Sequence, residues 1–162
     1  MSMIGNLIAL RTETLKSLVD DPDAIEVFLY PDDGDSEPEN HLDLDKSWHA
    51  IHFTLNGKAW EGEGPLSHVI LGGTEIGEDV GYGPARYLTP EQVQEAASAL
   101  KGVSPEEFGA RFNHSALTAA EIYPEMWQDG DGLEYVKGHY SELRDFYLAA
   151  AGRGDSVLIY LN

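Results

Sequence analysis

The sequence predicts an α+β fold in which a small mixed β-sheet of three to four short strands packs with about six helices. Three observations support this class. Apolar runs near both ends, at 3–10 and 156–161, have the length and the bounds of buried strands. Between them, apolar residues recur at helical spacing in several segments that begin or end with proline, glycine or a capping residue. No repeat, long linker or low-complexity tract divides the 162 residues, so we expect a single domain over 1–162.

The first part of the chain is expected to form a strand followed by two short helices. Residues 3–10 are apolar and bounded by charge, which indicates a buried strand. A helix starts at Thr12 or Thr14, and a second follows the break at 20–23. Their expected inward-facing residues are Leu15, Leu18 and Val19 in the first helix, and Ile25, Phe28 and Leu29 in the second. Residues 30–40 combine prolines and a glycine with acids and predict an exposed loop.

The stretch 42–57 has the clearest helical pattern in the first half of the chain. A helix from Asp45 to Asn56, capped by Asp43 or Asp45 and ended by Gly57, fits this pattern. Its apolar stripe comprises Leu44, Trp48, Ile51 and Leu55. A polar flank at the edge of that stripe comprises Asp45, His49, His52 and Asn56. We therefore expect a central packing helix with polar residues at the rim of the core.

The polar flank is the best candidate site, with Asp45, His49 and His52 as its candidate residues. These side chains could bind a divalent metal, or Asp45 could orient a histidine as a general base. The alternative is structural: an Asp–His pair finishes the helix end and His52 is hydrogen-bonded within the core. We favour the structural alternative, because the histidines are at i,i+3 and lack the glutamate of a His-Glu-x-x-His zinc motif. No metal or cofactor is expected.

The middle of the chain is rich in glycine. Residues 57–64 are a polar connector, and 66–71 are apolar enough to form a strand or a helical turn. The loop Gly81–Arg86 could hold a ligand near its backbone, with Arg86 binding an anionic group. It lacks the lysine of a phosphate-binding loop, and acids stand nearby. We favour a specific turn that leads into a short strand at 85–88.

The second half is dominated by helices with clear start signals. Thr89 and Ser104 each precede a proline and stand three residues before a Gln or Glu, which predicts a capped helix start at both places. A helical turn is expected at 116–121. Asp131 caps a long helix over 132–151 that ends at Gly152. The expected core face of this helix is Val136, Tyr140, Leu143, Tyr147 and Ala150. The strand at 156–161 is apolar enough to be central in a sheet.

Charge is the unusual bulk property of the sequence. Twenty-nine acids against ten bases give a net charge of −19 and a pI near 4.4. Eleven acids and no Lys or Arg occur from Asp20 to Asp45. This charge disfavours binding to nucleic acid or to a membrane surface, and it suits a basic protein partner or simply promotes solubility. The absence of cysteine, of a long apolar run and of a signal peptide leads us to expect a cytoplasmic protein.

Three blocks of sequence resemble the bacterial YfbM-like family, a domain of unknown function. They are Met3–Asn6, Asp43–Phe53 and Gly81–Leu88, which include Asp-Lys-Ser-Trp-His and Gly-Tyr-Gly-Pro-Ala-Arg. The resemblance extends over the whole chain. It implies a single cytoplasmic α+β domain. It implies no established activity and no catalytic residue that can be carried over.

Two functions of different classes follow from these observations. The first is an interaction module that binds a basic protein, in the manner of an inhibitor or immunity protein. The second is a small-molecule- or metal-dependent enzyme that combines Asp45, His49 and His52 with the Gly81–Arg86 loop. The enzyme hypothesis requires both blocks to meet in one concave pocket.

Overall fold

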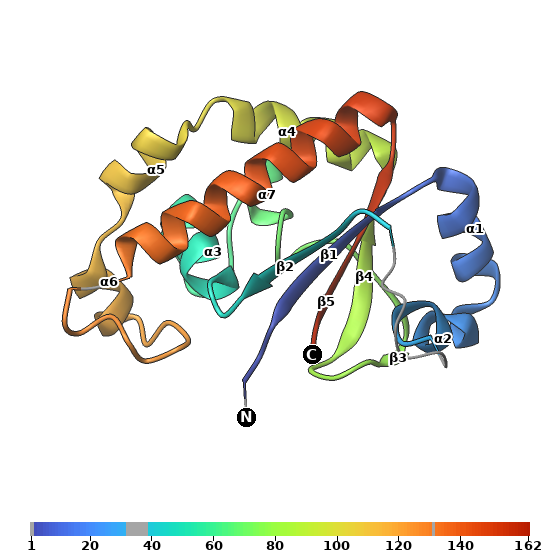
Figure 1. Ribbon diagram of the computed structural model, residues 1–162, viewed down its shortest axis with the longest axis horizontal. Helices are drawn as coiled ribbons and strands as arrows, with labels where there is room; N and C mark the ends of the chain where they lie inside the picture. Colours follow the sequence, from blue (N-terminus) through green and yellow to red (C-terminus); the bar gives the residue numbers. More distant parts are fainter. Residues whose placement is uncertain (1, 32–38, 131) are drawn as a thin grey trace.

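A 5-stranded sheet runs through the centre of the protein (Figure 1). The structure, a computed structural model, describes residues 2–31, 39–130 and 132–162. The strands, in their order across the sheet, are β2 (His41–Asp45), β1 (Gly5–Leu10), β5 (Ser156–Leu161), β4 (Pro84–Leu88) and β3 (Thr74–Asp79). All four neighbouring pairs are antiparallel.

The expectation of a mixed sheet with three to four strands was therefore wrong. The terminal strands were predicted, and the sequence at 85–88 was correctly assigned to a strand. β3 escaped prediction because only Ile76 of its six residues is buried, so it lacks an apolar pattern. β2 escaped because its last residues were assigned to the following helix.

Seven α-helices and two short 3-10 helices are present in the described residues, where about six helices were expected. On one side of the sheet lie α1 (Thr12–Asp20), the 3-10 turn η1 (Pro22–Ala24) and α2 (Ile25–Leu29). On the other side lie α3 (Trp48–Asn56), the 3-10 turn η2 (Pro65–Ser67), α4 (Pro90–Lys101), α5 (Pro105–Arg111), α6 (His114–Ala119) and α7 (Leu133–Arg153). None of these helices has the length and apolar character needed to cross a bilayer.

Strand β5 divides the interior into two cores. Val157 and Ile159 face the larger core, which α3, α4, α5 and α7 share. Leu158 and Tyr160 face the smaller core beneath α1 and α2. Because successive side chains of a strand point to opposite faces, a strand covered on both faces is apolar throughout. The prediction of a central C-terminal strand is confirmed.

The capped helices of the second half also match the prediction. Thr89 and Gln92 form both bonds of the capping box at the start of α4. At α5, the Ser104 hydroxyl accepts the Glu107 amide, which is the first bond of the expected box. All five expected core residues of α7 are buried.

Other boundaries differ from the expectation. Helix α7 ends at Arg153, and the residue that stops it is Gly154, with a left-handed φ of 75°, two residues after the expected Gly152. For the segment 66–71, where a strand or a helical turn was expected, the structure has the end of a 3-10 turn, which agrees with the second alternative. Val19 is 41% exposed and does not face the core. The expected cap Asp131 and residues 32–38 of the expected loop lie outside the described residues.

Candidate functional site

Helix α3 is buried on nearly all sides. It begins at Trp48, because 41–45 extends as strand β2 and Asp45 adopts a left-handed φ of 52° that breaks the helical path. The stripe of Leu44, Trp48, Ile51 and Leu55 is buried as expected. His49 and His52 are only 1% and 0% exposed, so they lie inside the protein and not at the rim of the core. Side chains buried this deeply need internal hydrogen-bond partners.

Both ring nitrogens of His49 are occupied by backbone groups. Nδ1 accepts the Tyr123 amide at 2.9 Å, so Nε2 carries the ring proton and donates it to the Ala59 carbonyl at 2.8 Å. This pair of bonds defines a neutral ring with one tautomer. His49 therefore joins α3 to two other segments, one 10 residues and the other 74 residues away in the sequence.

His52 is held in a similar way one turn later. Its Nε2 donates to the Glu61 carbonyl at 2.9 Å, and Nδ1 lies 3.3 Å from the Asn56 amide nitrogen. Asn56 also donates to the Leu66 carbonyl at 3.1 Å. The histidines are three residues apart on a helix, and the carbonyls they bind are two residues apart on an irregular connector. We call His49, His52 and the carbonyls of Ala59 and Glu61 the histidine clamp.

Burial sets the electrostatics of the clamp. It lowers the pKa of both His49 and His52, because a charged imidazolium is poorly solvated in the core. The hydrogen bonds to Ala59 and Glu61 oppose this effect, and the proximity of the two rings lowers the pKa of His49 further. Neutral rings with all nitrogens occupied leave no lone pair for a metal or for proton abstraction. The structural alternative for these histidines fits these contacts.

The clamp orders a connector that presents one large aromatic side chain to solvent. Trp60 lies between the two clamped carbonyls and is 61% exposed. Its ring sits over the imidazole of His49, with centroids 4.3 Å apart, and 6.2 Å from the centroid of Trp48. Glu61 and Glu63 follow it in the chain. One signal in the sequence points to this residue: it is a tryptophan in an otherwise polar, glycine-rich connector.

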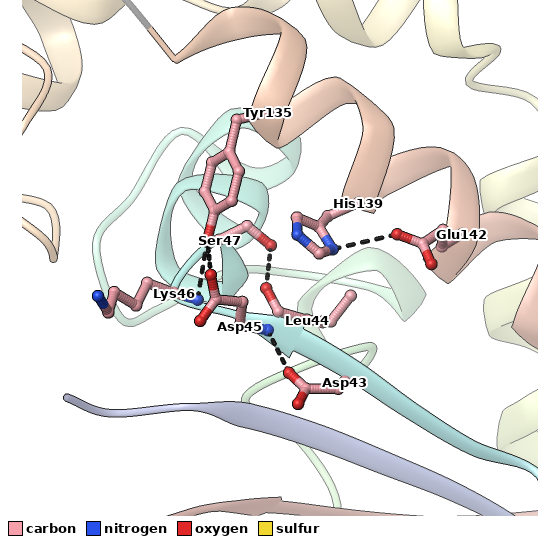
Figure 2. A network of polar contacts seen from close by, with 8 residues as sticks. All are labelled: Asp43, Leu44, Asp45, Lys46, Ser47, Tyr135, His139 and Glu142. Atoms are coloured by element: carbon pink, nitrogen blue, oxygen red, sulfur yellow. Dashed lines mark hydrogen bonds and ion pairs between the residues drawn. The ribbon is translucent and has the colours of Figure 1, made fainter.

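Asp45 belongs to a different network, at the junction of β2 and α3 (Figure 2). The Tyr135 hydroxyl donates to its carboxylate at 2.7 Å and accepts the Lys46 amide at 3.1 Å. Figure 2 shows Tyr135 reaching down from the first turn of α7 to this junction. Burial, and then the hydrogen bond to Asp45, raise the pKa of Tyr135 to about 12. The expected Asp45–His49 pair is absent, because the two residues are in different elements.

His139 and Glu142 complete the network in Figure 2. Nδ1 of His139 lies 3.2 Å from a Glu142 carboxylate oxygen, close enough for an ion pair when the ring is protonated, although the two atoms are not aligned for a hydrogen bond. Ser47 donates to the Leu44 carbonyl at 2.6 Å and closes the turn between β2 and α3. Within the described residues, no group of three or more His, Cys, Asp or Glu side chains is arranged to hold a metal ion.

Arg86 is engaged elsewhere. Its side chain donates to the Gly72 carbonyl at 2.9 Å, across the turn that leads into β3. Burial lowers the pKa of Arg86, although Tyr147 and Glu75 act in the opposite direction. Gly81 lies in the turn between β3 and β4, where the Asp79 carboxylate accepts its amide at 2.7 Å.

The contacts of the four candidate residues thus bring His49 and His52 together, and give Asp45 and Arg86 other partners.

These features define an antiparallel α+β domain whose most distinctive polar side chains hold backbone segments in place. A model of the family described as Domain of unknown function (DUF1877) matches residues 1–160. The chain belongs to this family, and the resemblance to YfbM-like proteins is confirmed.

A solved structure supports the same assignment at the level of the fold. The crystal structure of a protein of unknown function, YfbM from Escherichia coli, superposes with a TM-score of 0.74 at 23% sequence identity. The match covers 98% of this chain and 99% of YfbM. No curated protein matches the sequence.

Two of the three blocks that carry the family resemblance contact each other, and the third packs against the end of β5. The Trp48 indole donates to the Met3 carbonyl at 2.9 Å, and a Cβ added to Gly5 would stand 2.7 Å from the Cβ of Trp48. A Cβ on Gly81 would stand 2.7 Å from Asn162. These contacts give Met3, Gly5, Trp48 and Gly81 a role in packing.

Proposed function

We propose that the protein is an acidic interaction module that binds a positively charged protein segment through the connector 57–64. One observation carries this proposal: Trp60 is exposed, rigidly supported and followed by Glu61 and Glu63. Tryptophan is enriched among the residues that dominate binding energy at protein interfaces. Its ring attracts Arg and Lys side chains, and neighbouring acids strengthen that preference.

The rigidity of the connector supports this function. The histidine clamp fixes the carbonyls on both sides of Trp60, and His49 supports its ring from below. An ordered anchor loses little conformational entropy on binding. The net charge of −19 adds long-range attraction for a basic partner.

The enzyme hypothesis ranks second. It would require His49 or His52 to release a backbone partner before acting on a substrate or metal. It would also require Arg86 to leave the Gly72 carbonyl. No contact of these residues favours such a rearrangement.

A titration with a short Arg/Lys-rich peptide tests the proposal. Binding is followed by the fluorescence anisotropy of a dye on the peptide, a signal that is available in every variant. Trp48 and Trp127 are buried, so a change in the fluorescence of exposed tryptophan in the unaltered protein additionally reports on Trp60. We expect saturable binding that weakens at high salt and falls about ten-fold in Trp60→Ala. Tyr82→Ala removes another exposed aromatic residue and should leave the affinity unchanged.

Two results would contradict the proposal. Equal affinity in Trp60→Ala and the unaltered protein would show that charge alone attracts the peptide. Absence of binding at low ionic strength, in the titration and in a pull-down from lysate, would leave solubility as the explanation of the acidic composition.

A further inference from the structure

A second feature lies on the opposite side of the sheet from α3. A cavity of about 500 Å³ opens where β1 passes into α1 and α7 ends. This volume is within the range of small-molecule sites. None of the four candidate residues discussed above lines it.

Apolar side chains form part of the cavity lining. Ile8 and Leu10 are almost completely buried, at 1% and 6% exposure, and Phe28 packs beside them as part of the smaller core. Apolar side chains in the lining favour a ligand with a hydrocarbon or aromatic body, because burial of that body removes it from water.

The wall carries two of the five arginines in the chain, Arg11 and Arg153. Arg153 is oriented by Asp155, whose carboxylate accepts its Nε at 2.7 Å. That bond engages Nε, and the two terminal nitrogens of the guanidinium group make no hydrogen bond or ion pair with the described residues. Asp155 is only 7% exposed, so it holds Arg153 from inside the protein.

Arg11 provides the second cationic group. It is exposed at the entrance of α1, and no side chain caps that helix. Thr14, in the first turn of α1, lines the same wall. Uncapped backbone amides at the start of a helix attract a negatively charged ligand group. Guanidinium groups do the same, and they bind carboxylates in bidentate geometry.

Not every charge in the wall is favourable for an anion. Glu39 also lines the cavity, and Asp155 offsets the charge of Arg153. In a chain with only ten Lys and Arg residues, two arginines nevertheless line this one cavity beside apolar side chains, and they provide donors for an anion.

We propose that this cavity binds a small carboxylate with an apolar body, with Arg11 and Arg153 holding the carboxylate and Ile8, Leu10 and Phe28 contacting the body. The site is independent of Trp60, so it stands or fails separately from the proposed interaction with a basic partner.

Three probes of similar shape and different charge test this site. Phenylacetate, phenylacetamide and phenethylamine are titrated into isotope-labelled protein, and the backbone amide shifts are followed. We expect saturable shifts centred on 8–14 and 153–155 with phenylacetate, and at least ten-fold weaker binding of the neutral amide and of the amine.

Variants separate the contribution of each charge. Arg11→Ala and Arg153→Gln should each weaken phenylacetate about ten-fold, whereas Glu39→Gln should tighten it because it removes a repulsive charge. Arg111→Ala removes an exposed arginine elsewhere and should have no effect. Circular dichroism checks that each variant is folded. Equal binding of the three probes, tighter binding of the amine, or no saturable shift in this region would overturn the proposal.

Discussion

His49 and His52 stabilise the folded state only while their rings are neutral. Burial lowers the pKa of both histidines in the folded protein below the value of about 6.5 that they have in an unfolded chain. As the pH falls below about 6.5, the unfolded chain binds protons that the folded protein does not. The free energy of unfolding therefore decreases toward acid, by up to about 1.4 kcal/mol per pH unit for each ring.

A double variant, His49→Gln and His52→Gln, should lose this dependence. Glutamine offers an amide donor and an acceptor without titrating. Between about pH 7.5 and 5.5, we expect the unaltered protein to lose about 1–3 kcal/mol more stability than the variant, as measured by urea unfolding. The comparison removes the contribution of the carboxylates, which both proteins share.

Two further variants complete this test. His114→Gln changes an exposed histidine and should behave like the unaltered protein. His52→Gln alone should show about half of the effect if the double variant folds poorly. Parallel pH profiles for all proteins would show that the clamp does not depend on neutral rings.

Gly5 and Gly138 are expected to respond in opposite directions to the same substitution. A Cβ on Gly5 would lie 2.7 Å from the Cβ of Trp48, which is fully buried and has no room to move. Gly5→Ala should therefore cost about 1–3 kcal/mol. Gly138 lies within α7 with no atom within 4 Å of an added Cβ, so Gly138→Ala should stabilise the protein by about 0.5–1 kcal/mol. Denaturant unfolding of both variants measures the difference, and equal effects would contradict the proposed close packing at Gly5.

At the level of elements, Tyr135 connects the start of α7 to the junction of β2 and α3. Tyr135→Phe removes the donor to Asp45 and the acceptor of the Lys46 amide. We expect a loss of about 1–2 kcal/mol in thermal or denaturant unfolding. Tyr82→Phe, which removes an exposed hydroxyl, should cost less than about 0.5 kcal/mol. Equal losses in the two variants would show that the junction does not depend on Tyr135.

Elements with strong local signals were predicted from the sequence, and elements defined by distant partners were not. α4 and α7 follow from their caps or their apolar spacing, and β5 follows from its continuous apolar run. The start of α3 was misplaced because Leu44 fits both a helical stripe and the alternation of a strand. Leu44 belongs to a strand because β2 pairs with β1, and the local sequence alone does not show this pairing. β3 likewise depends on its pairing with β4.

The candidate site was predicted in part. The sequence identified His49 and His52 as polar residues next to a core stripe, and the structural alternative named a hydrogen-bonded His52. The partners of these rings could not be predicted, because they are backbone carbonyls of an irregular connector, which any residue provides. Nor could spacing alone show that Trp60, in that connector, would be exposed.

For the molecule as a whole, the net charge of −19 should make stability depend on salt. Like charges repel one another in the compact state, and added salt screens this repulsion. Raising sodium chloride from about 10 mM to 0.5 M should raise the Tm by roughly 2–6 °C in a calorimetric scan. A Tm that is constant or falls with sodium chloride would show that attractive charge pairs outweigh the repulsion.

The place of β5 between β1 and β4 also governs how the protein can be made. The ribosome synthesises β5 after the other four strands. The backbones of Ile4 and Asn162 therefore cannot pair until the residues that follow β4, through β5, have been made. Contacts between such distant residues form slowly. Until then, the backbone groups of β1 and β4 that pair with β5 have no partner, and apolar side chains that are buried in the two cores of the folded protein are exposed. We therefore expect the nascent chain to need protection from aggregation until its last strand has emerged.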